Sequence, residues 1–220
     1  MPYRNVLALA VAALSAVPAA AQELQTPSEW RWIADAPARL VTTQEVADSA
    51  WRFVAMPPGW HVTTGPGVLL FHPGYEGRER FTLEAELFLF PGESQAEYGV
   101  FVGGLRLDDP GRQYTAFVLR RDGAAAVVGR SGAGERVLLP WRVNEAVVPH
   151  TGSGTAKNVI TLHVEPAAVR FVVNGGEVGT LPHDALATGG GIGFRIGTGV
   201  NLHASRLDLT HHLAPPGKDQ

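Results

Sequence analysis

Apolar and polar residues alternate with period two over several short stretches of the chain, most clearly between residues 81 and 90. Successive side chains of a strand point to opposite faces, so this period indicates a half-buried strand. One face would carry Phe81, Leu83, Ala85, Leu87 and Leu89, and the other Thr82, Glu84, Glu86, Phe88 and Phe90. The first face is expected in the core and the second, with both glutamates, outside it.

Turn signals separate this stretch from further strand-like runs. Asp122-Gly123 and Asn174-Gly175 stand between pairs of apolar runs, where tight hairpins need residues that tolerate positive φ. Many short strands, and no amphipathic helix longer than about three turns, predict an all-β fold. We expect a jelly-roll sandwich of two antiparallel sheets.

The ends of the chain differ in composition from its middle. Residues 1–21 resemble a secretory signal, with Arg4, an apolar run too short to span a membrane, and small residues before Gln22. We expect residues 22–48 to form an N-terminal extension packing on the sandwich, 49–210 the sandwich itself, and 211–220 a flexible tail. The protein would then be periplasmic or secreted.

Composition limits the classes of partner. The chain has 220 residues, no cysteine and a net charge of −3 at pH 7, so disulfides do not stabilise it. No basic stripe is present, which argues against nucleic acid as a partner. After removal of the signal, no stretch is long and apolar enough to span a membrane.

The order of the motifs resembles a known superfamily. Phe-Thr-Leu-Glu-Ala-Glu from residue 81 is followed by Tyr-Gly-Val-Phe from 98, Arg-Arg-Asp-Gly from 120, Asn-Gly-Gly from 174 and Gly-Gly-Gly-Ile-Gly-Phe-Arg from 189. Over about residues 51 to 209 this pattern is similar to the concanavalin A-like lectins and glucanases. More narrowly, it resembles the 3-keto-disaccharide hydrolase-like domain-of-unknown-function group. The resemblance implies a concave sheet face that often holds an oligosaccharide or polysaccharide.

Glu84 and Glu86 are the candidate catalytic residues. Spacing two puts both on one strand face, at about the 5–5.5 Å separation that a retaining glycosidase needs. Laminarinase-type relatives carry a third acid where this chain has Leu89, so the motif is broken. The alternative interpretation is a solvated strand face.

Aromatic and basic residues on the expected strands are candidates for ligand binding. Aromatic rings stack on sugars, and arginines donate paired hydrogen bonds to hydroxyls or carboxylates. The candidates are Trp60, Tyr98, Tyr114, Arg120, Trp141, Arg195 and His203.

Arg195 leads to a specific expectation. It alternates with Ile192, Phe194 and Ile196, which places these three in the core and Arg195 outside it. If its strand shares a sheet with residues 81–90, Arg195 can reach Glu84 or Glu86 and hold it ionised, which favours ligand binding over general-acid catalysis.

No metal or cofactor is predicted. The eight histidines lack zinc-ligand spacing, and Asp108-Asp109 has no further carboxylate ladder for calcium. Three functions stay open: carbohydrate binding without catalysis, glycoside hydrolysis of the 3-keto-disaccharide type, and a non-catalytic protein-interaction domain of the envelope.

Overall fold

The computed structural model describes residues 25–213, so the expected signal segment, residues 1–21, lies outside the described part of the chain. Within residues 25–213 the chain forms fifteen strands and one short 3-10 helix. The first strands are β1 (Arg31–Ala34), β2 (Arg39–Val41), β3 (Ala50–Ala55), β4 (Trp60–Thr64) and β5 (Val68–Gly77). The middle strands are β6 (Phe81–Leu89), β7 (Tyr98–Leu105), β8 (Gln113–Leu119), β9 (Ala124–Ser131) and β10 (Gly134–Val143). The last elements are β11 (Ala156–Val164), β12 (Ala168–Val173), β13 (Gly176–Pro182), η1 (His183–Ala185), β14 (Gly190–Ile196) and β15 (Asn201–His211).

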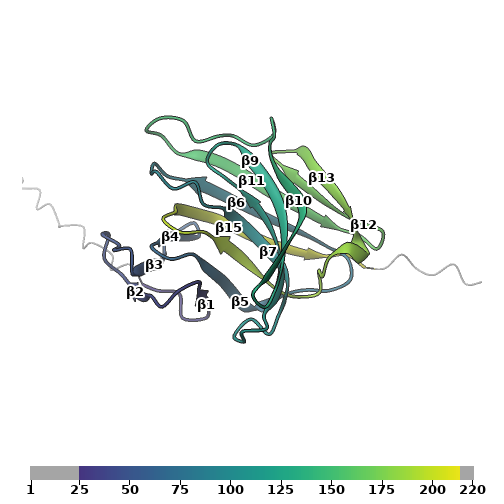
Figure 1. Cartoon of the computed structure of the whole chain (residues 1–220), viewed down its shortest axis with the longest axis horizontal. Coiled ribbons are helices and arrows are strands. Elements are labelled where there is room, and N and C mark those ends of the chain that lie inside the picture. The colour runs from purple at the N-terminus through teal and green to yellow at the C-terminus, as the bar shows by residue number, and fades with distance from the viewer. Residues whose placement is uncertain (1–24, 214–220) are drawn as a thin grey trace, which may run out of the picture.

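These strands form two sheets that lie face to face (Figure 1). Sheet A has the order β1-β5-β14-β7-β8-β9-β10, and sheet B the order β13-β12-β11-β6-β15-β4-β3-β2. All pairs are antiparallel except β2 with β3. The predicted jelly-roll sandwich is therefore confirmed.

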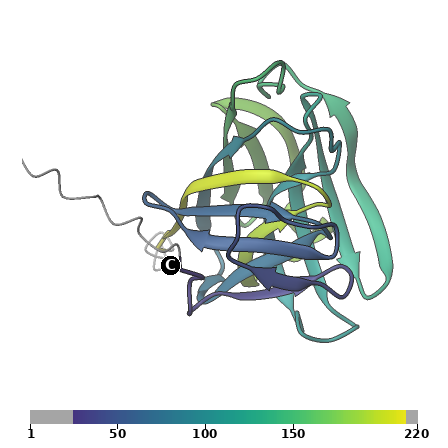
Figure 2. The ribbon, with the colours of Figure 1, turned by 90° about the vertical axis from the view of Figure 1, so that its left-hand side faces the viewer.

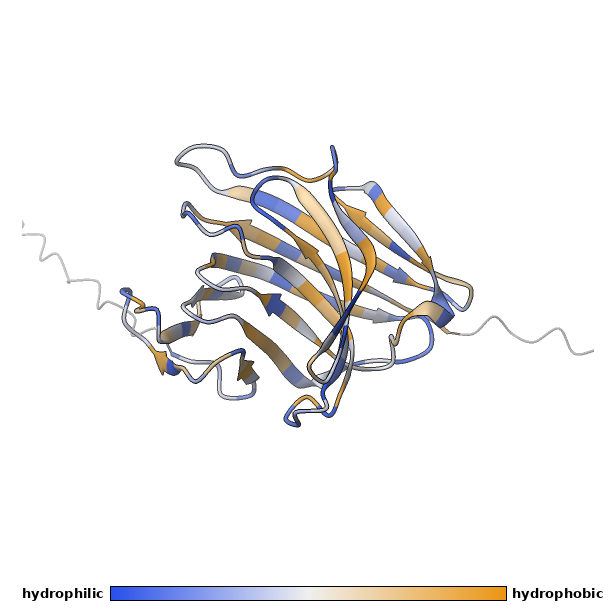
Figure 3. Cartoon of the chain, in the orientation of Figure 1, coloured by the Kyte–Doolittle hydropathy of each residue, from blue (hydrophilic) through white to orange (hydrophobic). Residues whose placement is uncertain are grey.

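Alternation along the strands builds the core between the sheets. On β6, the inward residues Phe81, Leu83, Ala85, Leu87 and Leu89 are at most 1% exposed, while the residues between them stay partly exposed. Ile192, Phe194 and Ile196 of β14 join them from sheet A, as predicted. Apolar colour follows the strands of both sheets and fades in the loops (Figure 3).

The two predicted hairpins form. Asp122-Gly123 joins β8 to β9, and Asn174-Gly175 joins β12 to β13. Asn174 and Gly175 both have positive φ, +50° and +85°, which is the backbone a tight two-residue turn requires.

The N-terminal segment contributes an edge strand to each sheet. β1 pairs with β5 in sheet A, and β2 runs parallel to β3 in sheet B (Figure 2, purple). The sequence of residues 36–45, with Pro37 and no clean period, predicts a loop. The structure differs, since Arg39–Val41 follows that proline and pairs with Ala50–Arg52. No helix in the described residues is long and apolar enough to cross a membrane.

One buried amide joins the loop before β11 to the core. Asn158 is 0% exposed, and its Oδ1 accepts hydrogen bonds from Val148 N (2.8 Å) and Asn174 Nδ2 (2.8 Å). Its Nδ2 donates to Val148 O (3.0 Å) and to the Tyr98 hydroxyl (3.2 Å). Replacing this side chain leaves several buried polar groups without partners.

We expect Asn158→Ala to lower the free energy of unfolding by about 2–4 kcal/mol, because each buried group left unpaired costs about 1–3 kcal/mol. Tyr98→Phe removes one of these hydrogen bonds and should cost about 1 kcal/mol. Urea unfolding of both variants measures the difference. Equal losses of unfolding free energy in Asn158→Ala and Tyr98→Phe would contradict a central role for Asn158.

Candidate functional site

The outer face of sheet A is hollowed by adjoining cavities. Two of them, of about 90 and 370 Å³, share Tyr114 and Arg130, and together they form what we call the sheet A groove. The smaller is lined by Glu97, Tyr114, Ala116, Val118, Val128, Arg130, Glu135, Trp141 and Arg195. The larger is lined by Asp35, Pro110, Arg112, Tyr114, Arg130, Gly132 and Ala133.

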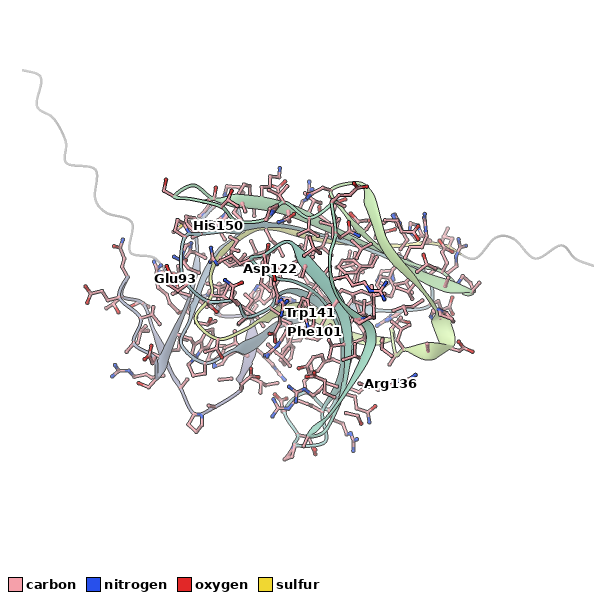
Figure 4. The ribbon with its side chains drawn as sticks, turned by 45° about the horizontal axis from the view of Figure 1, so that its top comes forward. Glu93, Phe101, Asp122, Arg136, Trp141 and His150 are labelled. Carbon is pink, nitrogen blue, oxygen red and sulfur yellow. The ribbon has the colours of Figure 1, made fainter. Side chains whose placement is uncertain are left out.

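The floor of the groove is apolar because the central strands of sheet A are hydrophobic on both faces. On β8, Phe117 and Leu119 point to the core between the sheets, while Ala116 and Val118 belong to a second cluster on the outer face. This cluster, completed by neighbouring strands, contains Leu69, Phe71, Phe101, Leu107, Tyr114, Ala116, Val118 and Ala126. Trp141 of β10 packs against this cluster, and Figure 4 labels Trp141 and Phe101.

An ion cluster lies beside this floor. The side chain of Arg195 is only 9% exposed, and its Nε and Nη2 donate to Glu97 Oε1 at 3.0 and 2.8 Å. Its Nη1 donates to Asp35 Oδ1 at 2.9 Å, and Nη2 lies 2.7 Å from Asp35 Oδ2. Burial alone lowers the pKa of Arg195, but the hydrogen bond and charge of Asp35, with Tyr114 and Glu97 nearby, raise it above its ordinary value. Arg195 is therefore a fixed cation.

The aromatic wall of the groove is held by a second arginine. The guanidinium of Arg120 lies 4.4 Å from the ring centroid of Trp141 and 3.2 Å from Asp122 Oδ2. A cation over an indole face stabilises the ring by about 0.5–1 kcal/mol at partly exposed sites. This contact keeps the Trp141 ring in place at the groove.

The sheet A groove thus brings together Tyr114, Trp141 and Arg195, with Arg120 behind the tryptophan. Two other candidates lie elsewhere. Tyr98 is 1% exposed, because the alternation of β7 turns it into the core with Val100, and its hydroxyl meets Asn158. Trp60 packs on the edge of the core, 4.8 Å from the Trp30 ring.

Glu84, Glu86 and His203 lie on the outer face of sheet B. Glu86 accepts hydrogen bonds from Lys157 (2.5 Å) and Ser205 (2.7 Å), and these two contacts lower its pKa. Glu84 pairs with Arg206 of β15. His203 Nε2 is 2.9 Å from Pro58 O, beside a cleft that Glu86 also lines.

The predicted pairing of Arg195 with Glu84 or Glu86 is wrong. Arg195 is on β14 of sheet A and both glutamates are on β6 of sheet B, with the core between them. Its actual partners, Asp35 and Glu97, were missed. Asp35 is 160 residues from Arg195 in the sequence, and no local sequence pattern connects the two. Glu97 directly precedes a strand, so the sequence could have identified it as a candidate partner of Arg195.

Comparison with known proteins identifies the fold. No protein-family model and no curated protein matches the chain. The carbohydrate binding module CBM66 from Bacillus subtilis superposes with a TM-score of 0.55 at 9% identity, over 72% of this chain and 90% of that one. A Bacteroides ovatus GH16 protein of the mixed linkage glucan PUL, solved with a product, gives 0.55 at 9% identity over 84% and 96%.

A third similar structure is the exoplasmic/lumenal domain of VIP36 in its Ca2+/Man3GlcNAc-bound form, with a TM-score of 0.55 at 7% identity over 89% and 91% of the two chains. At such identities the likeness shows the fold alone. The comparison supports the predicted concanavalin A-like jelly-roll fold, and the narrower resemblance to the 3-keto-disaccharide hydrolase-like group stays a prediction.

Arg195→Met leaves Asp35 and Glu97 side by side without their shared cation. Removing one partner of a fully buried pair costs about 3–5 kcal/mol, and partial exposure of the two carboxylates reduces this. We expect a loss of about 1–3 kcal/mol in urea unfolding, partly recovered by adding Asp35→Asn. The exposed Arg142→Met on β10 is the control and should change stability by less than about 0.5 kcal/mol. An equal loss of unfolding free energy in Arg195→Met and Arg142→Met would contradict a stabilising role of the ion cluster.

His61 makes stability depend on pH. Burial and then the charge of Arg52 lower its pKa from 6.5 to about 4, with smaller effects from Asn201 and His203. The unfolded chain therefore binds the proton more tightly, and stability falls as pH drops from about 6.5 to about 4, by up to about 1.4 kcal/mol per pH unit.

His61→Gln should flatten this part of the stability–pH curve, measured by urea unfolding between pH 7 and pH 4.5. His211→Gln, at an exposed position, should leave the slope as in the wild type. An unchanged slope in His61→Gln would show that another group controls it.

Proposed function

We propose that this protein binds an oligosaccharide or polysaccharide in the sheet A groove, outside the cytoplasm and without cleaving it. The observation that carries the proposal is the meeting of two aromatic side chains, Tyr114 and Trp141, with the Arg195 ion cluster in one groove. Aromatic rings match the apolar faces of sugar rings, and fixed polar groups at the margin orient the hydroxyls.

The polar groups in the groove suit hydroxyl recognition. Arg195 bonds Oε1 of Glu97, while Glu97 Oε2 has no hydrogen-bond or ion-pair partner among the described residues. A carboxylate fixed in this way accepts hydrogen bonds from hydroxyl groups. Glu135 and Arg130 supply a further acceptor and donor on the same groove.

Structural neighbours support the same class of ligand. Three structures with this fold are a carbohydrate binding module, a GH16 protein with product, and a domain bound to Man3GlcNAc. Fold alone does not confer function, so the groove residues carry the proposal and the neighbours add to it.

Glycoside hydrolysis by Glu84 and Glu86 is less well supported. A general acid needs a raised pKa, and the contacts of Glu86 with Lys157 and Ser205 lower it. The two glutamates also lie on the sheet opposite to the aromatic groove. Export, inferred from residues 1–21, is tested separately by locating the mature protein in cell fractions.

Trp141→Ala should weaken binding to a neutral oligosaccharide ligand at least tenfold, because central aromatic side chains dominate binding energy in such sites. A panel of neutral oligosaccharides, including gluco-, manno- and fructo-oligosaccharides, is first screened by tryptophan fluorescence, and affinities are then measured by calorimetry. Trp32→Phe is the control, since Trp32 is 40% exposed and lies outside the groove. Full affinity in Trp141→Ala would exclude the groove as the binding site.

A further inference from the structure

The larger cavity of the sheet A groove carries an unbalanced pair of arginines. Arg112 and Arg130 both line this cavity of about 370 Å³, on either side of Tyr114 in the sequence, and Asp35 is the one carboxylate in its lining. Both oxygens of Asp35 already contact Arg195. The positive charge of the two arginines is therefore available at this end of the groove.

Neighbouring carboxylates neutralise little of the positive charge of Arg112 and Arg130. The closest carboxylate oxygen to Arg130 belongs to Glu135, at 3.9 Å, in a pair that is well exposed. Such exposed pairs contribute little. Within the described residues, no carboxylate lies within 4 Å of Arg112.

The loop before β8 also holds two aspartates, and neither of them lines the larger cavity. Asp109 Oδ1 accepts a hydrogen bond from Gly111 N at 2.5 Å, and Asp108 faces Arg31 at 4.0 Å. The remaining arginine of this loop, Arg106, donates to Gly111 O. Arg112 is therefore the charged residue of this loop that lines the cavity.

We propose that the groove selects acidic sugars, with the carboxylate of a uronic acid residue bound by Arg112 and Arg130. This inference rests on the proposed function and adds the substrate class. The planar guanidinium donates paired N–H bonds that match a carboxylate, which a neutral hydroxymethyl group does not. The uronate ring lies against Tyr114, and the next sugar extends toward Trp141 and Glu97.

The experiment compares ligands that differ only in the carboxylate. Oligomers of galacturonate, mannuronate and guluronate are titrated by calorimetry into the full mature chain, alongside the same oligomers with each carboxyl reduced to a hydroxymethyl group. The wild type should bind at least one acid oligomer tenfold or more tightly than its reduced counterpart. Added salt should bring the ratio of the two affinities closer to one.

Variants assign the preference to the two arginines. Arg112→Gln combined with Arg130→Gln should bring the ratio of acid to reduced affinity close to one, and Arg112→Lys should give an intermediate ratio because the charge stays and the fork is lost. Arg142→Gln, on β10 outside the groove, should keep the wild-type ratio. Circular dichroism and urea unfolding confirm that each variant is folded. If the double variant does not fold, the affinity ratio of Arg112→Lys decides the test instead.

The outcomes separate this inference from the proposed function. Equal affinity for acid and reduced oligomers, or tighter binding of a sulfated oligomer than of any uronate, overturns the acidic-sugar inference while carbohydrate binding stands. An acid preference that survives in the double variant also overturns it. Binding to no acidic oligomer overturns it as well, and the neutral panel with Trp141→Ala then decides the proposed function by itself.

Discussion

The guanidinium of Arg195 adds a buried ionic link between segments far apart in the sequence, which strand pairing brings side by side in sheet A. It lies on the outer face of sheet A, nearly excluded from water, where an unpaired charge is costly. Its compensation comes from Asp35, just after β1, and from Glu97, just before β7. The N-terminal segment is thereby fixed against the central strands, and the groove acquires a rigid polar margin. The positions of the Asp35 and Glu97 side chains at the groove margin depend on their ion pairs with Arg195.

A second constraint is that the central strands of sheet A are apolar on both faces. One face forms the core with sheet B, and the other forms the outer cluster around Phe101 and Ala126. The loops at one end of the sandwich are joined by Arg121, which donates to Ser94 O and whose carbonyl accepts from His150 N. Figure 4 shows Glu93, Asp122 and His150 at that end. The floor of the groove is therefore supported by the apolar cluster of sheet A, and the loops at one end of the sandwich are held by the hydrogen bonds of Arg121.

The sequence was sufficient for features that depend on neighbouring residues. Alternation identified the buried face of β6, and the Asn-Gly and Asp-Gly pairs identified two hairpins, since both signals act over a few residues. It failed where the outcome depended on which sheet a strand joins. Arg195 and Glu86 both point outward as alternation requires, yet from opposite sheets. Tyr98 was a ligand-binding candidate as an aromatic residue on an expected strand, and only the packing of the two sheets shows that its hydroxyl meets Asn158 in the core.

The charged groups on the two outer faces support the proposal of sugar binding rather than cleavage. On sheet B, Glu86 is surrounded by Lys157 and Ser205, both of which stabilise its ionised form. On sheet A, Asp35 and Glu97 share the guanidinium of Arg195 beside Tyr114 and Trp141. The general acid of a glycoside hydrolase needs a raised pKa, whereas the contacts of Glu86 lower its pKa. Carboxylates and arginines beside aromatic rings suit hydrogen bonding to sugar hydroxyls and stacking on a sugar ring, which is the chemistry of a binding groove.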